Sequence, residues 1–135
     1  MFEVIGKIPN IYQCHCRLCR KATGSSANAA TLVHESNFRW VSGLELIASF
    51  SKETGFQSSF CSRCGSPVPN KIVEAGMIWV PAGLLGEELD SKVSVHLFLA
   101  SSAKWEKESG RCVRLDEAPS NLGSLYNLLQ RKNTS

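Results

Sequence analysis

Two groups of cysteines constrain this chain more than any other feature of its sequence. Five of the six cysteines fall into these groups, with Cys14, Cys16 and Cys19 in the first and Cys61 and Cys64 in the second. The first group forms a C-x-C-x-x-C motif, and the second forms C-x-x-C-G. In a reducing compartment, structural disulfides are rare, and cysteines this close together are metal ligands or redox thiols. We therefore expect the fold to be built around a cysteine site.

The C-x-C-x-x-C motif has the ligand chemistry of a zinc site. Three sulfurs within six residues can turn toward one ion, as Zn²⁺ requires at about 2.3 Å per sulfur. Three protein ligands with an open fourth position are the arrangement of catalytic zinc. Arg17, Arg20 and Lys21 surround the motif, and their charge favours thiolate over thiol. The motif therefore predicts zinc bound by all three cysteines, at a catalytic type of site.

The second cysteine group is half of a zinc knuckle. Gly65 follows Cys61 and Cys64 and allows the sharp turn that a knuckle needs. Spacing alone permits a closed site of four sulfurs, two from each group, in a binding or scaffold module, although that site leaves a fifth sulfur unexplained. A redox dithiol is the other use, although no βαβ pattern surrounds the pair. We expect Cys61 and Cys64 to bind metal, and we expect no metal role for the lone Cys112.

The composition is that of one globular domain over residues 1–135. The chain has 43% hydrophobic and 20% charged residues, which is ordinary for a folded domain of this length. The net charge of +3 is too small to indicate a protein that binds nucleic acid. We find neither an apolar stretch of about 18 residues nor a secretory signal. We therefore expect a cytoplasmic protein that does not enter the membrane.

Short apolar segments at roughly even spacing predict a mainly β fold. The expected strands are Ala30–Val33, Phe38–Val41, Leu44–Phe50, Phe56–Phe60, Ser66–Ile72, Met77–Pro81 and Val93–Leu99. The third of them is expected to be buried, and two prolines confine the fifth to an edge or an irregular segment. Leucines at helical spacing between Leu122 and Leu129 predict a short C-terminal helix, capped by Ser120 or Asn121. We expect its apolar stripe to pack on the domain's own core, and a partner-binding or dimer helix is the alternative.

The order of these motifs resembles that of the glutathione-dependent formaldehyde-activating enzyme family, which also includes centromere-protein-V-type domains. The segments that resemble its signatures are Cys14–Gly24, Phe60–Pro67, Val80–Leu85, His96–Phe98 and Ser101–Trp105. Their order and spacing agree over most of the chain. Several motifs in the same order are far more specific than one motif alone.

The resemblance implies a β-tent fold, with short antiparallel strands around zinc-binding cysteine loops. It implies a catalytic-type zinc on the first cysteine group. It also implies a structural zinc that Cys61 and Cys64 share with an N-terminal C-x-C. That C-x-C does not precede Phe2 in this sequence. We therefore expect either a start codon assigned too late or a member that dispenses with the second zinc. Without these partners, Cys61 and Cys64 would bind metal weakly, stay as thiols or oxidise to each other.

The function that the resemblance implies is a zinc-dependent carbon–sulfur lyase acting on adducts of a small thiol, such as glutathione, with formaldehyde. Arg17, Arg20 and Lys21 would meet carboxylates of the substrate, or would otherwise be solvated charges. His96 is expected to be a satisfied core histidine, with contact to substrate as the second interpretation. His15 is expected to be a spacer between ligands. The alternative function is a non-catalytic, zinc-stabilised binding or scaffold module, and a homodimer is a further possibility.

Overall fold

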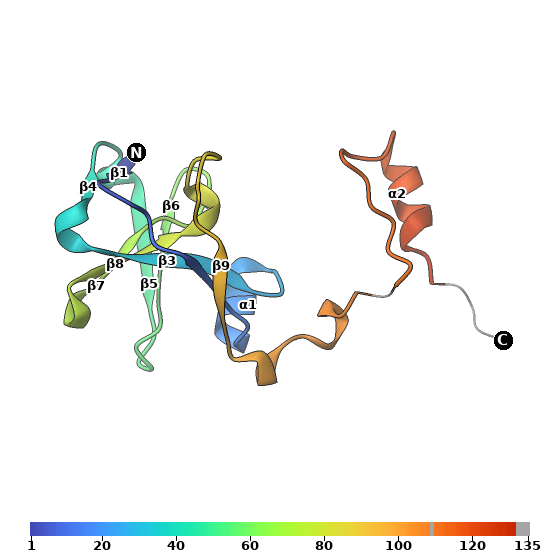
Figure 1. Cartoon of the computed structure of the whole chain (residues 1–135), viewed down its shortest axis with the longest axis horizontal. Helices are drawn as coiled ribbons and strands as arrows, with labels where there is room; N and C mark the ends of the chain where they lie inside the picture. Colours follow the sequence, from blue (N-terminus) through green and yellow to red (C-terminus); the bar gives the residue numbers. More distant parts are fainter. Residues whose placement is uncertain (109, 132–135) are drawn as a thin grey trace.

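The protein has a mainly β body followed by an extended C-terminal segment (Figure 1). The computed structural model describes residues 1–108 and 110–131. The described strands are β1 (Phe2–Val4), β2 (Ile11–Cys14), β3 (Asn28–His34), β4 (Phe38–Trp40), β5 (Ile47–Ser51), β6 (Gln57–Cys61), β7 (Asn70–Ile72), β8 (Met77–Pro81) and β9 (Val93–Leu97). The α-helices are α1 (Arg17–Thr23) and α2 (Leu122–Leu129). The predictions of a mainly β fold and of a short C-terminal helix are confirmed.

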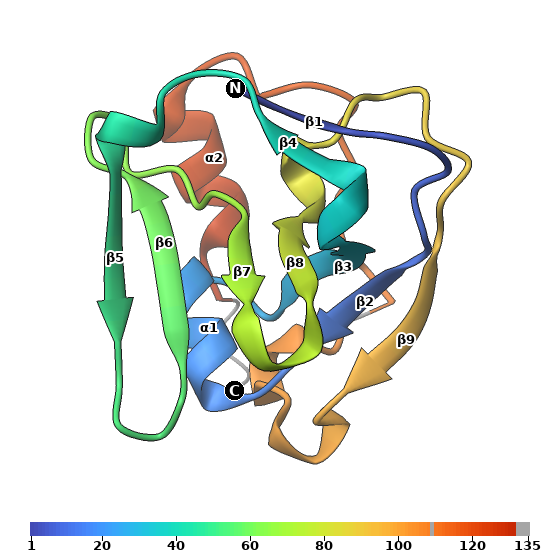
Figure 2. The ribbon, with the colours of Figure 1, turned by 90° about the vertical axis from the view of Figure 1, so that its left-hand side faces the viewer.

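A five-stranded sheet forms the centre of the body. Its order is β7-β8-β3-β2-β9, and β2 and β9 are its one parallel pair. The segment with two prolines contributes only its end, β7, and β7 is an outermost strand, as the prolines predict. The β5–β6 hairpin stands beside α1 and β7, as Figure 2 shows. This arrangement places β2, which leads into the first cysteine group, between two neighbouring strands.

The core of the body is small and lies on β3 and β8. Its buried residues are Val33, Ile78 and Val80, and Phe2, Val4, Phe38 and Leu85 pack against them. Threonine and valine are β-branched and favour strands, and Ala30 and Thr31 are also buried in β3. Thr31 donates a hydrogen bond of 2.9 Å to the carbonyl of Asn10. This bond ties the middle of β3 to the segment that leads into β2.

The helix α1 begins directly after β2 because Cys16 caps it. The sulfur of Cys16 accepts a hydrogen bond from the backbone N–H of Cys19, at 3.4 Å. Gly24 ends the helix in the left-handed conformation, with φ of 62°, which favours glycine. The segment Leu18–Thr23, followed by Gly24, predicts one helical turn that stops at this glycine. The first cysteine group therefore lies at the junction of a strand and a helix.

Two expectations about packing are wrong. The helix α2 has no buried residue and lies away from the body (Figure 1), so its stripe does not pack on the core. The irregular chain that precedes α2 carries it outward. The segment Leu44–Phe50 is not a buried strand, because β5 pairs with β6 in a two-stranded hairpin and its second half is exposed. No helix in the described part of the chain is long and apolar enough to cross a bilayer.

Candidate metal centre

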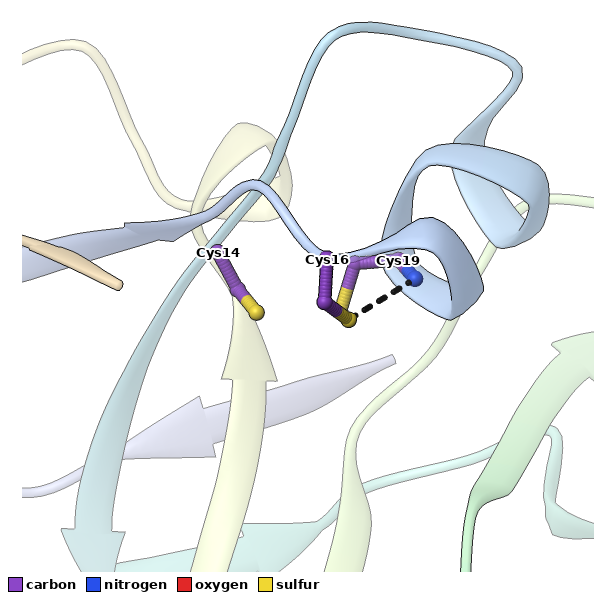
Figure 3. Close-up of side chains that lie close together, drawn as sticks. All are labelled: Cys14, Cys16 and Cys19. Carbon is purple, nitrogen blue, oxygen red and sulfur yellow. Dashed lines mark hydrogen bonds between the residues drawn. The ribbon is translucent and has the colours of Figure 1, made fainter. Parts of the chain in front are cut away.

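The three sulfurs of the first cysteine group converge at the start of α1. The Sγ atoms of Cys14, Cys16 and Cys19 all lie within 4.8 Å of one another. Figure 3 shows the three side chains pointing to the same side of the loop. In a tetrahedral zinc site with bonds of about 2.3 Å, the sulfurs lie about 3.8 Å apart. The spacing and the donor atoms therefore fit a metal ion.

The ionisation of these thiols favours a cation between them. Burial raises the pKa of Cys19 well above its usual value, and its hydrogen bonds with Cys14 and Cys16 and their charges add to this rise. Burial also acts to raise the pKa of Cys16. Hydrogen bonds from the backbone N–H of Cys19 and from neighbouring thiols outweigh it, so that pKa is lowered. Because thiolates this close repel one another, a full set of three requires a positive charge at their centre.

The first cysteine group has three protein ligands rather than four. No fourth His, Cys, Asp or Glu side chain joins it among residues 1–108 and 110–131. Cys61 and Cys64 lie outside the cluster, so the closed site of four sulfurs is not formed. The second group is folded as half a knuckle, in which the N–H of Gly65 donates to the carbonyl of Cys61 at 2.7 Å. A hydrogen bond of 3.3 Å between Cys64 Sγ and Ser66 Oγ lowers the pKa of Cys64.

His15 is more than a spacer between ligands. Its side chain is 2% exposed, with Nδ1 3.2 Å from a carboxylate oxygen of Glu106 and Nε2 3.1 Å from Nδ1 of His96. A carboxylate only accepts hydrogen bonds, so Nδ1 of His15 donates to Glu106. Between Nε2 of His15 and Nδ1 of His96, one ring nitrogen carries the hydrogen and the other accepts it. The backbone N–H of His15 also donates to the carbonyl of Leu97, at 2.9 Å. A chain of hydrogen bonds therefore joins the loop that carries the first cysteine group, the metal loop, to β9 and to the segment after β9.

The expectation that His96 is a core residue is wrong. His96 is exposed because β9 is an outermost strand whose five residues all face solvent to a large extent. Glu106 was not among the residues singled out from the sequence. It lies 91 residues from His15, and no local pattern signals such a pairing.

Two cavities lie on opposite faces of α1. One, of 510 Å³, is lined by Cys19 and Thr23 of the helix and by residues of the β5–β6 hairpin, β7 and β8. The other, of 480 Å³, is lined by Arg17, Arg20, Lys21, Gly24, Ser25 and Trp105. The structure therefore brings the three cations together, but not into the cavity that Cys19 lines. His96 lines neither of the two cavities.

A second polar pair lies close to the cysteines. The indole Nε1–H of Trp79 donates to the phenolic oxygen of Tyr12 at 2.7 Å. Burial raises the pKa of Tyr12; the bond from Trp79 acts in the opposite direction, and charges on Cys19 and Cys14 add to the rise. The hydroxyl therefore keeps its hydrogen at neutral pH. This pair joins β2 to β8 across β3, so the sequence carries no local signal for it.

The family model described as glutathione-dependent formaldehyde-activating enzyme matches residues 1–101. The chain belongs to the glutathione-dependent formaldehyde-activating enzyme family. The match includes both cysteine groups and ends before Trp105, Glu106 and α2. A search of curated proteins finds no match. In a member of this zinc-associated family, the cluster of three cysteines is a set of side chains that could hold a metal ion.

Proposed function

We propose that the protein is a zinc-dependent enzyme of the carbon–sulfur lyase type, which joins a small thiol such as glutathione to formaldehyde or splits their adduct. One observation carries the proposal: three converging sulfurs, without a fourth ligand among the described residues, adjoin a cavity that Cys19 lines. Its volume of 510 Å³ lies within the range of small-molecule sites. A purely structural zinc would instead have four protein ligands.

Cys14, Cys16 and Cys19 would hold the zinc. Zn²⁺ is borderline-soft and takes thiolate ligands readily. Zinc bound there would lower the pKa of a thiol in the fourth position, so that the thiolate is available at neutral pH. The contribution of the chain is rigidity, because Cys14 is fixed in a central part of the sheet, and the N-cap bond fixes Cys16 against Cys19.

In the proposed reaction, the sulfur of the thiol forms a bond with the carbonyl carbon of formaldehyde. The second bond of the carbonyl breaks, and its electron pair moves to the oxygen. The thiol loses one proton and the oxygen gains one, which gives an S-hydroxymethyl adduct. We propose Tyr12 as the hydrogen-bond donor to that oxygen, because it lies near enough to Cys14 and Cys19 for their charges to act on it. Trp79 already donates to the phenolic oxygen, so the hydroxyl hydrogen is left for another acceptor.

We also propose that Arg17, Arg20 and Lys21 bind a carboxylate of the thiol substrate. The Nε of Arg20 is buried and has no hydrogen-bond partner among the described residues, and arginine pairs well with carboxylates.

Zinc content, measured by elemental analysis on full-length protein purified without added metal, is the first test. We expect at least one zinc per chain, at the first group, and a second would place metal on Cys61 and Cys64 as well. No zinc would reject the metal mechanism. In cobalt-substituted protein, glutathione should change the sulfur-to-cobalt absorption, whereas S-methylglutathione, which has no thiol, should not. The exchange of ¹³C-formaldehyde with its glutathione adduct, followed by NMR, should be faster with the enzyme.

The non-catalytic alternative makes the opposite prediction. A zinc-stabilised scaffold would contain zinc, but glutathione would leave the cobalt spectrum unchanged and the exchange rate would equal that of the buffer. This pair of results would reject the proposed enzyme and retain the metal.

A further inference from the structure

The C-terminal arm, residues 107–131 without residue 109, carries a row of exposed apolar side chains. They are Val113, Leu115, Leu122, Leu125, Tyr126, Leu128 and Leu129. The polar contacts of the arm include local ones, such as Arg114 to Glu108 at 2.8 Å and the N–H of Ser124 to Asn121 at 2.8 Å. Figure 1 shows the arm leading away from the body. The arm therefore presents apolar surface where its own body does not cover it.

The body has a second exposed apolar surface on β9. Val95 and Leu97 are two residues apart, so they share one face of this strand, and both are exposed. The register with β2 shifts between Val93 and Val95, and Val93 is exposed as well. Phe98 and Leu99 follow them and are exposed as well. The strand pairs with β2 along one edge and is outermost in its sheet. An exposed apolar strand at the edge of a sheet is a surface suited to docking.

The accessible area of the chain is too large for a compact monomer. It is 10,625 Å², whereas a compact monomer of 14.8 kDa exposes about 7,000 Å². The excess is about 3,600 Å² per chain. Stable homodimers bury about 2,000–5,000 Å² in total. Burial of half of the excess in each of two chains therefore supplies the area that a stable dimer needs.

The short length of α2 also indicates that the helix packs on another surface. The helix has eight residues, and isolated helices shorter than about 12 residues are marginal in water. Asn121 caps its first turn, but short helices in proteins gain most of their stability by packing an apolar face. The helix therefore needs a surface on which to pack.

We propose that two copies of this chain form a symmetric dimer, in which α2 of each copy packs on the exposed apolar face of β9 of the other. An arm that leads away from its own body reaches a second copy without turning back. Reciprocal exchange of the two arms closes the assembly at two chains. This dimer lies beyond the proposed enzymatic function and does not depend on it.

Sedimentation velocity over a range of concentrations, on the full-length protein with its metal, tests the dimer. The variant Leu125→Lys/Leu129→Lys places two charges on the apolar face of α2 and should raise the dimer dissociation constant at least about 100-fold. The matched control Ser124→Lys/Asn127→Lys adds the same charge to the opposite face. It should leave the dissociation constant within about threefold of that of the wild type.

The β9 half of the interface has its own pair of variants. Val95→Lys should weaken the dimer at least about tenfold, whereas Thr54→Lys, which adds the same charge at the exposed turn between β5 and β6, should not. Circular dichroism checks that each variant is folded. A wild-type monomer at every concentration would overturn the proposal, as would a species larger than two chains. A dimer dissociation constant that neither the α2 variant nor the β9 variant changes would overturn it too.

Discussion

Replacement of His15 by leucine would show how strongly the chain from Glu106 through His15 to His96 holds the metal loop. Because His15 is buried, the change leaves the carboxylate of Glu106 and Nδ1 of His96 without these hydrogen bonds. A hydrogen bond to a charged group contributes about 1.5–3 kcal/mol and a neutral one about 0.5–1.5 kcal/mol. Glu106 and His96 keep access to water, so the lower values apply. We expect His15→Leu to lower the free energy of unfolding by about 2 kcal/mol, and Tm by about 8 °C.

Two polar variants distinguish the contribution of the hydrogen bond to Glu106 from that of the hydrogen bond to His96. In His15→Asn, the amide nitrogen takes the place of Nδ1 and can still donate to Glu106, so the loss should fall to about 0.5–1 kcal/mol. In His15→Gln, the amide takes the place of Nε2 and can still pair with His96. That variant should lose about 1.5 kcal/mol.

Urea unfolding of the zinc-saturated protein, followed by tryptophan fluorescence, measures these differences. Elemental analysis of the same samples shows whether a variant has lost stability because its hydrogen bonds are missing or because its zinc is missing. His34→Leu is the control, because His34 is exposed and bonds Ser36 two residues away, and it should lose less than about 0.5 kcal/mol. Equal losses for His15→Leu and His34→Leu would refute the reasoning. So would an asparagine variant no more stable than the leucine variant.

Three further predictions concern the metal and the core. Cys16→Ser should lose most of the zinc that elemental analysis detects, whereas Cys112→Ser should keep it; equal zinc content would contradict the ligand assignment. Because the raised pKa of Cys19 keeps its thiol protonated without metal, zinc must displace a proton. Apparent zinc affinity should therefore rise at least about tenfold per pH unit in chelator competition between pH 6 and 8, and a flat profile would argue against this displacement. Val80→Ala, in the core, should lower the free energy of unfolding by about 2 kcal/mol, against less than about 0.5 kcal/mol for the exposed Val41→Ala.

The parts of the site that were predicted correctly from the sequence are local. The three cysteines of the first group lie within six residues, so one strand end and one helical turn suffice to bring their sulfurs together. Gly24 ends α1 as expected, because the left-handed conformation there favours glycine. Asn121 caps α2 for an equally local reason, since its side chain accepts from Ser124 three residues on.

The parts that could not be predicted depend on the order of strands in the sheet. The bonds of His15 reach 81 and 91 residues along the chain, and that of Tyr12 reaches 67. They exist because β2 lies beside β9 on one edge and one strand away from β8 on the other. The exposure of His96 follows from the same order, since an outermost strand lacks a neighbour that would bury it.

The sequence by itself determined the chemistry of the protein: which residues can bind a metal, where the helices begin and end, and which family the motifs resemble. These depend on side-chain type and on contacts within a few residues, which the chain carries wherever it is placed. Only the tertiary structure decided that the cations and Cys19 face different cavities, that His15 is held from two sides, and that α2 leaves the body. Those outcomes come from sheet order and from which surfaces find a neighbour, because packing over long sequence separations is a property of the whole fold.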